Sequence, residues 1–371
     1  MKKNITVIPG DGIGPEVIRE AVKVLHAVAL KFHHHFNFIY CAMGAAAIDK
    51  TGDPLPQDTI DSCLKNDAVL LGAIGHPRYD HDPSAKVRPE QGLLKLRKEL
   101  QLFANIRPVT TNITLYNLSP LKEKQLHGVD FVIYRELTGG IYFGKKELND
   151  EGTEASDLCI YNRKEIERIT RLGFSAAQKR RKKLTLVDKA NVLETSRLWR
   201  KTVQEIAKSY SDVKVDYLYV DNAAMQLILN PRQFDVILTE NMFGDILSDE
   251  ASVLSGSLGL LPSSSVGEKN ALFEPIHGSY PQAAGKDIAN PVGAILSAAL
   301  MMEYFELFDE AKAIREAVEW TLGNGFVTRD IDPINSYSTS TIGELVSDYI
   351  GNDIPQNINL KNMALGQTTI I

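Results

Sequence analysis

Residues 4–22 read NITVIPGDGIGPEVIREAV and join two different patterns through a glycine-rich turn. The β-branched run at the start, NITVIP, predicts a short strand. After the turn, apolar residues recur at the spacing of a helix, and Pro15 stands in the first helical turn, where proline is favoured. A strand that leads through a tight turn into a helix is the building unit of α/β proteins. The stretch therefore predicts an α/β fold.

The same alternation continues along the chain. We expect further strands at 36–41, 67–75, 129–136, 183–188, 213–221 and 233–240, and helices at 55–65, 163–180, 193–210, 291–307, 309–323 and 339–350. Residues 255–265 and 278–286 are rich in glycine, proline and serine, so they are expected to be loops. Strands that alternate with helices favour a largely parallel sheet.

The composition excludes several classes of protein. Of the 371 residues, 44% are hydrophobic and 24% are charged, which suits a folded chain of about two domains. The net charge of -6 argues against a nucleic-acid partner. The cysteines, Cys41, Cys63 and Cys159, are far apart, form no zinc pattern and suit a reducing cytoplasm. We expect a cytoplasmic protein without a signal peptide or a membrane span, because no apolar stretch reaches roughly 18 residues.

The glycine turn resembles a dinucleotide-binding fingerprint without matching it. Gly10 and Gly12 fit the pattern GxGxxG, but Pro15 occupies the position of its last glycine. Two interpretations stay open, a tight strand-to-helix turn and a loop beside a cofactor. The failed pattern argues against a Rossmann fold.

Three aspartates stand at the ends of two predicted strands. Asp245 and Asp249 follow the strand 233–240 in the run FGDILSD, and Asp221 ends the strand 213–221. If Asp245 opens a helix, Asp249 lies one turn further along the same face. Sites in parallel sheets form beyond the carboxyl ends of strands, and oxygen donors without clustered His or Cys favour Mg²⁺ or Mn²⁺. Helix capping is the alternative, and it explains Asp221 better than Asp249.

Cations and proton carriers complete the candidate site. Arg97 and Arg107 flank an apolar segment, and Arg135 ends an apolar strand, where an unpaired charge would be costly. Arginine binds carboxylates bidentately, so the three predict either an anionic substrate or structural ion pairs. Lys189 follows the strand 183–188, and Tyr142 lies in the glycine loop after Arg135. Next to a divalent cation, these two would suit a base and an acid. The alternative for each of them alone is a structural or surface residue.

Long, nearly contiguous blocks of this chain resemble the isocitrate/isopropylmalate dehydrogenase family of metal-dependent β-decarboxylating dehydrogenases. The matching blocks are VIPGDGIGPEV, RPEQGLLKLRKELQLFANIRP, YRELTGGIYFG, VDKANVLE, NMFGDILSDEASVLSGSLGLLPS and FEPIHGSYPQAAGKDIANP. The resemblance covers the chain to about residue 350. It implies an open α/β sheet that is not a Rossmann fold.

The resemblance also implies a domain arrangement and an assembly. Residues 1–102 and 255–371 would form a discontinuous cofactor-binding domain, and residues 103–254 a domain for dimerisation, metal and substrate. The family is dimeric with shared active sites. Lys189 and Asp221 would come from the partner subunit.

Carried over by position, the family's functional residues take these roles. Arg97, Arg107 and Arg135 would hold the carboxylates of a substituted malate, and Asp221, Asp245 and Asp249 would hold Mg²⁺ or Mn²⁺, with Asp221 also near the substrate. Lys189 would take the hydroxyl proton as hydride passes to NAD, and Tyr142 would protonate the enolate left by CO₂. The adenosine site would involve the glycine loop around Gly278 with Glu274, His277 and Asn290. Further cofactor contacts would come from Ile13, Gly75, Glu90, Ser279 and Ala289.

Four residues indicate the substrate and the cofactor. Isocitrate-using relatives place Ser and Asn where this chain has Leu93 and Leu94, and Glu90 would repel a third carboxylate. The leucines suit the isopropyl group of (2R,3S)-3-isopropylmalate, whose oxidative decarboxylation to 4-methyl-2-oxopentanoate belongs to leucine biosynthesis. Gln282 replaces the aspartate that grips the ribose hydroxyls in NAD-using relatives. We therefore expect NAD with reduced discrimination against NADP.

Two rival hypotheses remain, together with one motif that only resembles a metal site. The chain could act on isocitrate, homoisocitrate or tartrate, or it could be a non-catalytic subunit, although such a subunit should have lost a metal aspartate, the lysine or the tyrosine. The run FHHHF at 32–36 suggests a metal site, but consecutive histidines do not share one face, so we expect surface residues.

Overall fold

The computed structural model describes residues 1–80 and 87–352. The chain divides into two compact units, which we call the first unit (residues 1–100, 257–264 and 269 onward) and the second unit (residues 101–256 and 265–268). These changeovers lie within two residues of the boundaries expected at 102 and 255, but residues 265–268 belong to the second unit instead of the first. The functions expected for the two domains stay predictions.

The first unit is an α/β structure with a mainly parallel sheet. Its strands follow the order β2-β1-β3-β12-β11, with β1 parallel to β2 and β3, and β12 parallel to β3. The strands are β1 (Lys2–Gly10), β2 (His35–Tyr40), β3 (Ala68–Ala73), β11 (Pro262–Val266) and β12 (Ala271–Pro275). The helices are α1 (Gly14–Lys31), α2 (Ala45–Thr51), α3 (Gln57–Lys65), α4 (Pro77–Asp80), α5 (Pro89–Glu99), α11 (Val292–Tyr304), α12 (Phe308–Gly323) and α13 (Thr339–Gly351), with 3-10 turns at Leu258–Leu260 and Pro281–Ala283.

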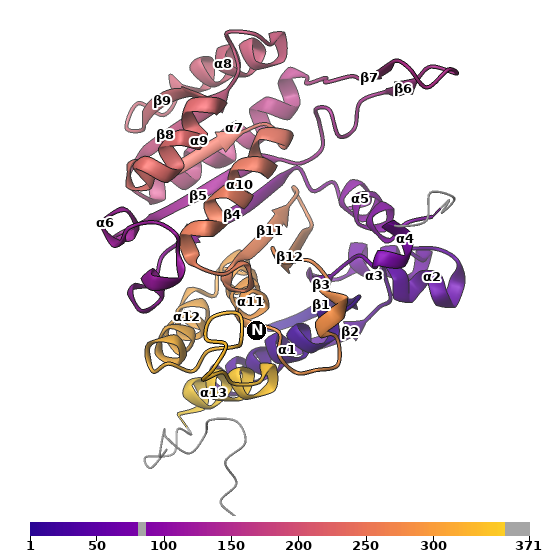
Figure 1. The fold of residues 1–371 in the computed structure, drawn as a ribbon, viewed down its shortest axis with the longest axis vertical. Coiled ribbons are helices and arrows are strands. Elements are labelled where there is room, and N and C mark those ends of the chain that lie inside the picture. The colour runs from indigo at the N-terminus through magenta and orange to yellow at the C-terminus, as the bar shows by residue number, and fades with distance from the viewer. Residues whose placement is uncertain (81–86, 353–371) are drawn as a thin grey trace, which may run out of the picture. The chain divides into compact units, whose positions relative to one another are not determined.

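Apolar sequence runs explain the centre of this unit. Strand β3 is buried along its whole length, which fits its continuous apolar run AVLLGA. Helix α1 begins at Gly14, with proline in its first turn, and packs against α11 and α13, as Figure 1 shows. The expectation of a loop over 255–265 was wrong in part, because β11 lies within it. Three serines of β11 are buried, and a polar, proline-containing run carries little strand signal.

The second unit is a sheet covered by helices on both faces. The strand order is β4-β5-β10-β8-β9; β4 is antiparallel to β5, and the other pairs are parallel. The strands are β4 (Ala104–Thr110), β5 (Asp130–Glu136), β8 (Lys183–Asp188), β9 (Lys214–Tyr219) and β10 (Val236–Thr239), with a separate hairpin of β6 (Lys146–Leu148) and β7 (Ala155–Asp157). The helices are α6 (Glu123–Leu126), α7 (Arg163–Lys179), α8 (Glu194–Ala207), α9 (Val220–Leu229) and α10 (Asn241–Ser255), with 3-10 turns at Ile113–Leu118 and Pro231–Gln233.

Strand alternation divides the apolar side chains of the second unit between two cores. On β5, Val132 and Tyr134 pack in one core with residues of α7 and α8, whereas Phe131 and Ile133 pack in the other with residues of α9 and α10. A capping box between Asn162 and Glu165 begins α7. The loops that leave the carboxyl ends of the strands start from these two packed layers.

The core under α7 makes a stability prediction. Phe174 is fully buried, and its ring stacks on Tyr210 at 4.7 Å between centroids. Phe174→Ala should lower the free energy of unfolding by about 3–5 kcal/mol, because it leaves a cavity between helix and sheet. Denaturant titration measures this change. The matched control is Leu30→Ala at an exposed position, for which we expect a change within about 0.5 kcal/mol; equal effects would contradict the packing described.

Candidate active site

Helix α10 carries the two aspartates of the run FGDILSD. The helix begins at Asn241, so the expectation that Asp245 opens it was wrong: Asp245 lies one turn inside, and Asp249 one turn further. Strand β10 ends at Thr239, Glu240 is the N-cap, and α10 begins at Asn241. As expected, the two aspartates share one face of the helix.

Two arginines from neighbouring strands face these aspartates. Arg135 of β5 donates to Oδ1 of Asp245 from Nη1, and Arg107 of β4 donates to Oδ1 of Asp249 from Nη1 at 3.0 Å. Arg107 also donates to the hydroxyl of Ser248 at 2.6 Å, and its Nη2 lies 3.9 Å from Asp245. The guanidinium of Arg135 is buried, so these contacts balance a charge that would otherwise be costly in the core.

A glycine lets the helix approach the arginine so closely. A Cβ on Gly244 would stand 2.5 Å from the side chain of Arg135, so a larger residue would push α10 away from β5. The turn after β5 brings in Tyr142, whose hydroxyl donates to Oδ2 of Asp245 at 2.8 Å. Burial raises the pKa of Tyr142, and the hydrogen bond to Asp245 adds to the shift. Tyr142 therefore keeps its proton at neutral pH.

Lys189 and Asp221 form a second group within the same unit. Lys189 follows β8, Asp221 lies in the first turn of α9, and Nζ donates to Oδ1 at 2.5 Å. This hydrogen bond is the largest cause that lowers the pKa of Asp221. Among the described residues, no three His, Cys, Asp or Glu side chains stand close enough to bind one metal ion. One chain therefore does not bring Asp221 together with Asp245 and Asp249.

Helix α5 in the first unit carries four of the predicted substrate residues. Glu90, Leu93, Leu94 and Arg97 follow the spacing of one helical face. Leu93 is half-buried and Leu94 is exposed, so this face offers an apolar surface beside a cation. Arg97 donates from Nη2 to Glu274 at 2.8 Å, while its buried Nε has no partner among the described residues. A predicted substrate arginine thus pairs with a predicted cofactor residue.

The glycine turn after β1 is ordered by an aspartate that the sequence interpretation missed. Buried Asp11 accepts backbone N–H groups from Ala45 at 2.9 Å, Ala46 at 3.0 Å and Gly75 at 3.0 Å. Its position between two glycines at the end of a strand was the available signal. Through these hydrogen bonds, Asp11 connects the turn after β1 to the start of α2 and to the loop at Gly75.

Close backbone approach explains the glycines of this turn. A Cβ on Gly12 would stand 1.9 Å from the carbonyl oxygen of Ser279, to which the backbone N–H of Ile13 donates at 2.8 Å. A Cβ on Gly75 would lie 2.9 Å from Glu90 and 3.7 Å from the hydroxyl of Ser279. Four residues predicted to contact the cofactor, Ile13, Gly75, Glu90 and Ser279, therefore gather at these loops.

A cavity of about 510 Å³ opens beside the same loops within the first unit. Of the predicted cofactor residues, five line it: Ile13, His277, Gly278, Ala289 and Asn290. The sequence interpretation missed Leu258, Ile288, Tyr280 and Asp330, which also line it and come from segments without a recognisable nucleotide motif. Gln282 is exposed and does not line it.

One buried nitrogen in this cavity has no partner among the described residues. His277 Nδ1 lies 3.0 Å from the carbonyl oxygen of Gly278, so this nitrogen must donate. Burial lowers the pKa of His277, so the ring is neutral and Nε2 is an acceptor. Nε2 is the nitrogen without a partner. An unsatisfied buried acceptor in a mostly apolar cavity suits a ligand that carries an amino group, as adenine does.

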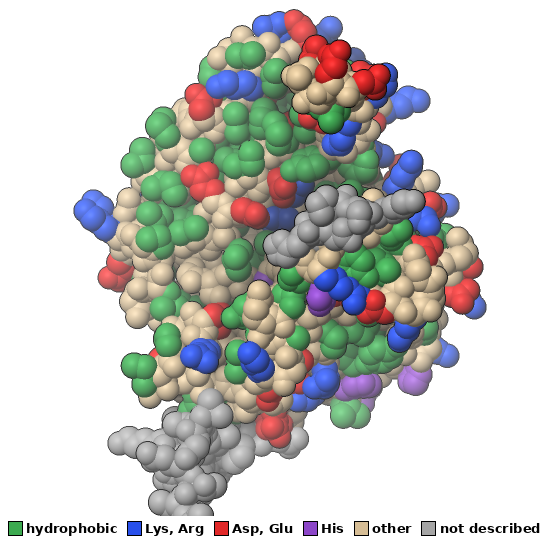
Figure 2. Space-filling model, turned by 45° about the vertical axis from the view of Figure 1, so that its right-hand side comes forward, with side chains coloured by type: hydrophobic (Ala, Val, Ile, Leu, Met, Phe, Trp, Pro, Cys, Tyr) green, Lys and Arg blue, Asp and Glu red, His purple; other side chains and the backbone are tan. Residues whose placement is uncertain are grey.

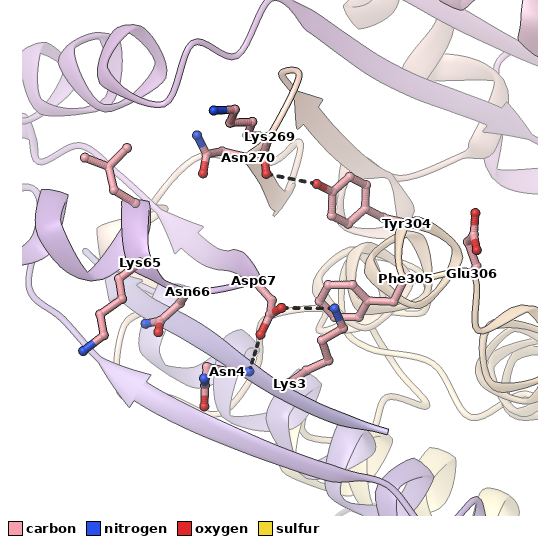
Figure 3. Close-up of a pocket in the computed structure, with 11 residues that line it drawn as sticks. Lys3, Asn4, Lys65, Asn66, Asp67, Lys269, Asn270, Tyr304, Phe305 and Glu306 are labelled. Atoms are coloured by element: carbon pink, nitrogen blue, oxygen red, sulfur yellow. Dashed lines mark hydrogen bonds and ion pairs between the residues drawn. The ribbon is translucent and has the colours of Figure 1, made fainter.

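A larger polar pocket of about 780 Å³ lies elsewhere in the first unit (Figure 3). Its inward charges already pair: Lys3 donates to Asp67 at 3.0 Å, and the backbone N–H of Asn4 donates to the same carboxylate at 2.8 Å. Asn4 lies near the start of β1, and Asp67 precedes β3, so this pocket is at the amino ends of the strands. Ligand sites of open α/β sheets form at the carboxyl ends.

The histidine run is accounted for by packing. His33 and His35 are exposed, as expected, whereas His34 bonds Glu310 of α12 at 2.5 Å.

Among residues 1–80 and 87–352, no helix has the length and apolar character to cross a membrane.

The chain is similar to several known proteins. Residues 4–346 match the family described as isocitrate/isopropylmalate dehydrogenase. A 3-isopropylmalate dehydrogenase of Bacteroides fragilis (strain YCH46) is 53% identical over 352 residues, which cover 94% of this chain and 99% of that protein. A 3-isopropylmalate dehydrogenase of Bacillus subtilis (strain 168) is 54% identical, with 92% of this chain and 94% of that protein covered.

Solved structures share the fold. An isocitrate dehydrogenase from Methylococcus capsulatus has a TM-score of 0.84 and 36% identity, and the match covers 94% of this chain and 99% of that chain. A β-decarboxylating dehydrogenase from Thermococcus kodakarensis, in its apo form, has a TM-score of 0.78 and 36% identity, with coverage of 96% and 99%. An open α/β sheet, a family match over nearly the whole length and relatives of more than half identity lead to one conclusion. The chain belongs to the isocitrate/isopropylmalate dehydrogenase family.

Proposed function

We propose that this protein catalyses the oxidative decarboxylation of (2R,3S)-3-isopropylmalate to 4-methyl-2-oxopentanoate and CO₂, with NAD and Mg²⁺ or Mn²⁺, in leucine biosynthesis. The observation that carries the proposal is the meeting of Arg107 and Arg135 with Asp245, Asp249 and Tyr142 on β4, β5, α10 and the adjoining turn. Relatives that are more than half identical over nearly the whole chain are named 3-isopropylmalate dehydrogenase, which supports this substrate over isocitrate.

The arginines would bind the two carboxylates of the malate. Arg107 and Arg135 of the second unit and Arg97 of the first each have a guanidinium held by hydrogen bonds, so little side-chain entropy is lost when an anion binds. Leu93 and Leu94 share a helix face with Arg97 and would contact the isopropyl group. Burial of an apolar branch there stabilises binding by about 0.8 kcal/mol per methylene.

The aspartates suit a divalent cation. Asp245 and Asp249 are hard oxygen donors whose side chains are 35% and 66% exposed, so both have room for a further ligand beside their arginines. Asp221 of the partner subunit would complete the set. When bound, the ion would polarise the substrate hydroxyl and carboxylate as a Lewis acid.

Two side chains would move the protons of the reaction. Lys189 would take the proton of the C2 hydroxyl while the C2 hydride passes to NAD, the hydride acceptor when bound. CO₂ then departs and leaves its bonding electron pair with the substrate as an enolate. Tyr142, whose hydroxyl is protonated at neutral pH, would give its proton to C3.

An apolar surface on the second unit supports a homodimer. Ile246 and Val253 of α10 are exposed, and Asp249 lies between them at spacings of three and four residues, on the same helical stripe. On α9, exposed Met225 lies one turn after Asp221. Figure 2 shows hydrophobic side chains gathered on the face of this unit. A two-fold partner that covers both stripes would bring one subunit's Asp221 toward the other's Asp249.

The first test is a direct assay. Purified protein should produce NADH from 3-isopropylmalate, with isocitrate at least about tenfold poorer in kcat/KM because the leucine face offers no partner for its third carboxylate. EDTA should stop turnover, and added Mg²⁺ or Mn²⁺ should restore it. Turnover that persists in EDTA would contradict the metal role, and a preference for isocitrate would contradict the substrate.

The shared site makes a complementation prediction. Lys189→Ala and Tyr142→Phe should each lower kcat by about a factor of 10²–10⁴ and leave substrate binding measurable by calorimetry. If Lys189 comes from the partner, a mixture of the two variants, unfolded and refolded together, forms hybrids with one intact site. Random pairing then returns about a quarter of the wild-type activity. A refolded mixture that stays as inactive as its parents would show that each site takes both residues from one chain.

The cofactor makes a third prediction. Gln282 has no charge to repel a 2′-phosphate, so kcat/KM for NAD should exceed that for NADP by a modest factor only. Gln282→Asp should widen this ratio by roughly tenfold, since a carboxylate repels the phosphate and binds the ribose hydroxyls. Gln282→Asn, which adds no charge, is the matched control. An equal or higher kcat/KM with NADP for the unaltered protein would contradict the assignment of NAD.

A further inference from the structure

Two buried asparagines of the second unit each accept a hydrogen bond from Nε of one of the two arginines. Oδ1 of Asn105 accepts from Nε of Arg107 at 2.8 Å. Oδ1 of Asn241 accepts from Nε of Arg135 at 3.0 Å and from its Nη2 at 2.8 Å. Both asparagines are about 1% exposed. They come from different elements, β4 and the first turn of α10, so the repeated geometry does not follow from one shared backbone motif.

These contacts decide which edge of each guanidinium remains for other partners. A guanidinium is a rigid, planar fork of five N–H donors. With the Nε edge held by the asparagine, the opposite side turns outward: Nη1 of Arg135 meets Asp245, and Nη1 of Arg107 meets Ser248 and Asp249. A carboxylate group of a substrate needs this outward edge for a bidentate pair.

The acceptor on the buried side is neutral, and this matters for charge. A carboxylate in place of either amide would also satisfy the buried N–H groups, but it would cancel the arginine's charge inside the core. An amide satisfies the buried donors without adding a negative charge to the aspartates of α10 that already face each arginine. Burial of the asparagines keeps water from replacing them as the fixed acceptor.

Asn241 has a second connection, to the turn that carries Tyr142. Its side-chain amide donates to the carbonyl oxygen of Gly139 at 3.2 Å, and its backbone N–H donates to the hydroxyl of Tyr161 at 3.0 Å. Tyr161 is buried edge-on against Trp199 at 5.5 Å between centroids. Asn105 instead donates to Ser265 of β11 at 3.2 Å. Only Asn241 of the two therefore links its arginine to the Tyr142 turn by these contacts.

We propose that Asn105 and Asn241 are positioning residues, which aim Arg107 and Arg135 at the substrate carboxylates without neutralising them, and that Asn241 also places the turn of Tyr142. This inference rests on the proposed function. It goes beyond it by assigning roles to two side chains that touch neither substrate nor cofactor. Tyr161 acts behind Asn241 as the fixed support of its backbone.

The test uses four variants of the full chain. Asn105→Ala should raise KM for 3-isopropylmalate by about tenfold to a hundredfold, since a hydrogen bond to a charged group is lost, and should leave kcat within about threefold. Asn241→Ala should raise KM similarly and also lower kcat by at least about tenfold, because the Tyr142 turn loses its support. Asn241→Asp should raise KM more than Asn241→Ala, because it adds a neutralising charge. Tyr161→Phe, a milder change, should move the same parameters in the same direction as Asn241→Ala.

Two measurements separate positioning from loss of stability. KM for NAD should stay within about twofold in all four variants, because the lining of the first-unit cavity is unchanged. Val203→Ala is the matched control: it removes two methyl groups from the core between sheet and helices in the same unit, and should lower Tm without changing either KM. Calorimetry of 3-isopropylmalate binding with Mg²⁺ gives an equilibrium readout that does not depend on turnover.

The outcomes differ for the inference and for the proposed function. A wild-type protein that neither binds nor oxidises 3-isopropylmalate contradicts the proposed function and this inference with it. A wild type that does both, with asparagine variants that bind the acid equally tightly, contradicts the inference alone. So does a parallel rise in KM for substrate and NAD, or an Asn241→Asp variant that binds as well as the wild type.

Discussion

A buried positive charge constrains the second unit. Arg135 stands near the end of a central strand, in the core between sheet and helix, where an ionised group is stable only with matched acceptors. Those acceptors, Asn241 and Asp245, come from one helix, α10, which must lie close enough to reach them. Gly244 permits this approach, since any side chain there would collide with the arginine. This requirement explains why Asn241, Gly244 and Asp245 stand where they do in the run NMFGDILSD.

In the first unit, a buried carboxylate, that of Asp11, lies at the carboxyl edge of the sheet. Buried Asp11 accepts three backbone N–H groups from two segments, at Ala45–Ala46 and at Gly75, and glycines let the backbones meet there. The mostly apolar cavity opens beside these loops. The polar pocket at the other ends of the strands contains charges that already pair with each other. In both units, the buried charged side chains, Arg135 and Asp11, therefore lie near the carboxyl ends of strands.

The functional groups of one chain form two sets within the second unit. Arginines, two aspartates and a tyrosine form one set, and the Lys189–Asp221 pair forms the other. Asp249 and Asp221 each share a helix face with exposed apolar side chains. Carboxylates on an apolar surface are consistent with a surface that is covered when the protein is at work. Two separate sets of functional residues in one chain are consistent with the shared active sites that we expect from the family.

The sequence alone determined the fold class, most helices and strands, and the chemical identity of the residues that meet on α10. Periodicity and strand-to-turn-to-helix junctions depend on neighbours along the chain, so β8 and α7 lie almost where they were expected. The sequence did not reveal β11, whose buried serines carry no apolar signal, or the first turn of α10, where Asn241 and not Asp245 begins the helix. Tertiary structure decided which side of Arg135 faces outward, because its acceptor Asn241 lies 106 positions away along the chain. Asn105 lies on the same strand as Arg107, and only the packing of the core shows that it is buried. Buried amides look like ordinary polar residues in a sequence, and only the packed core shows which charge they hold in place.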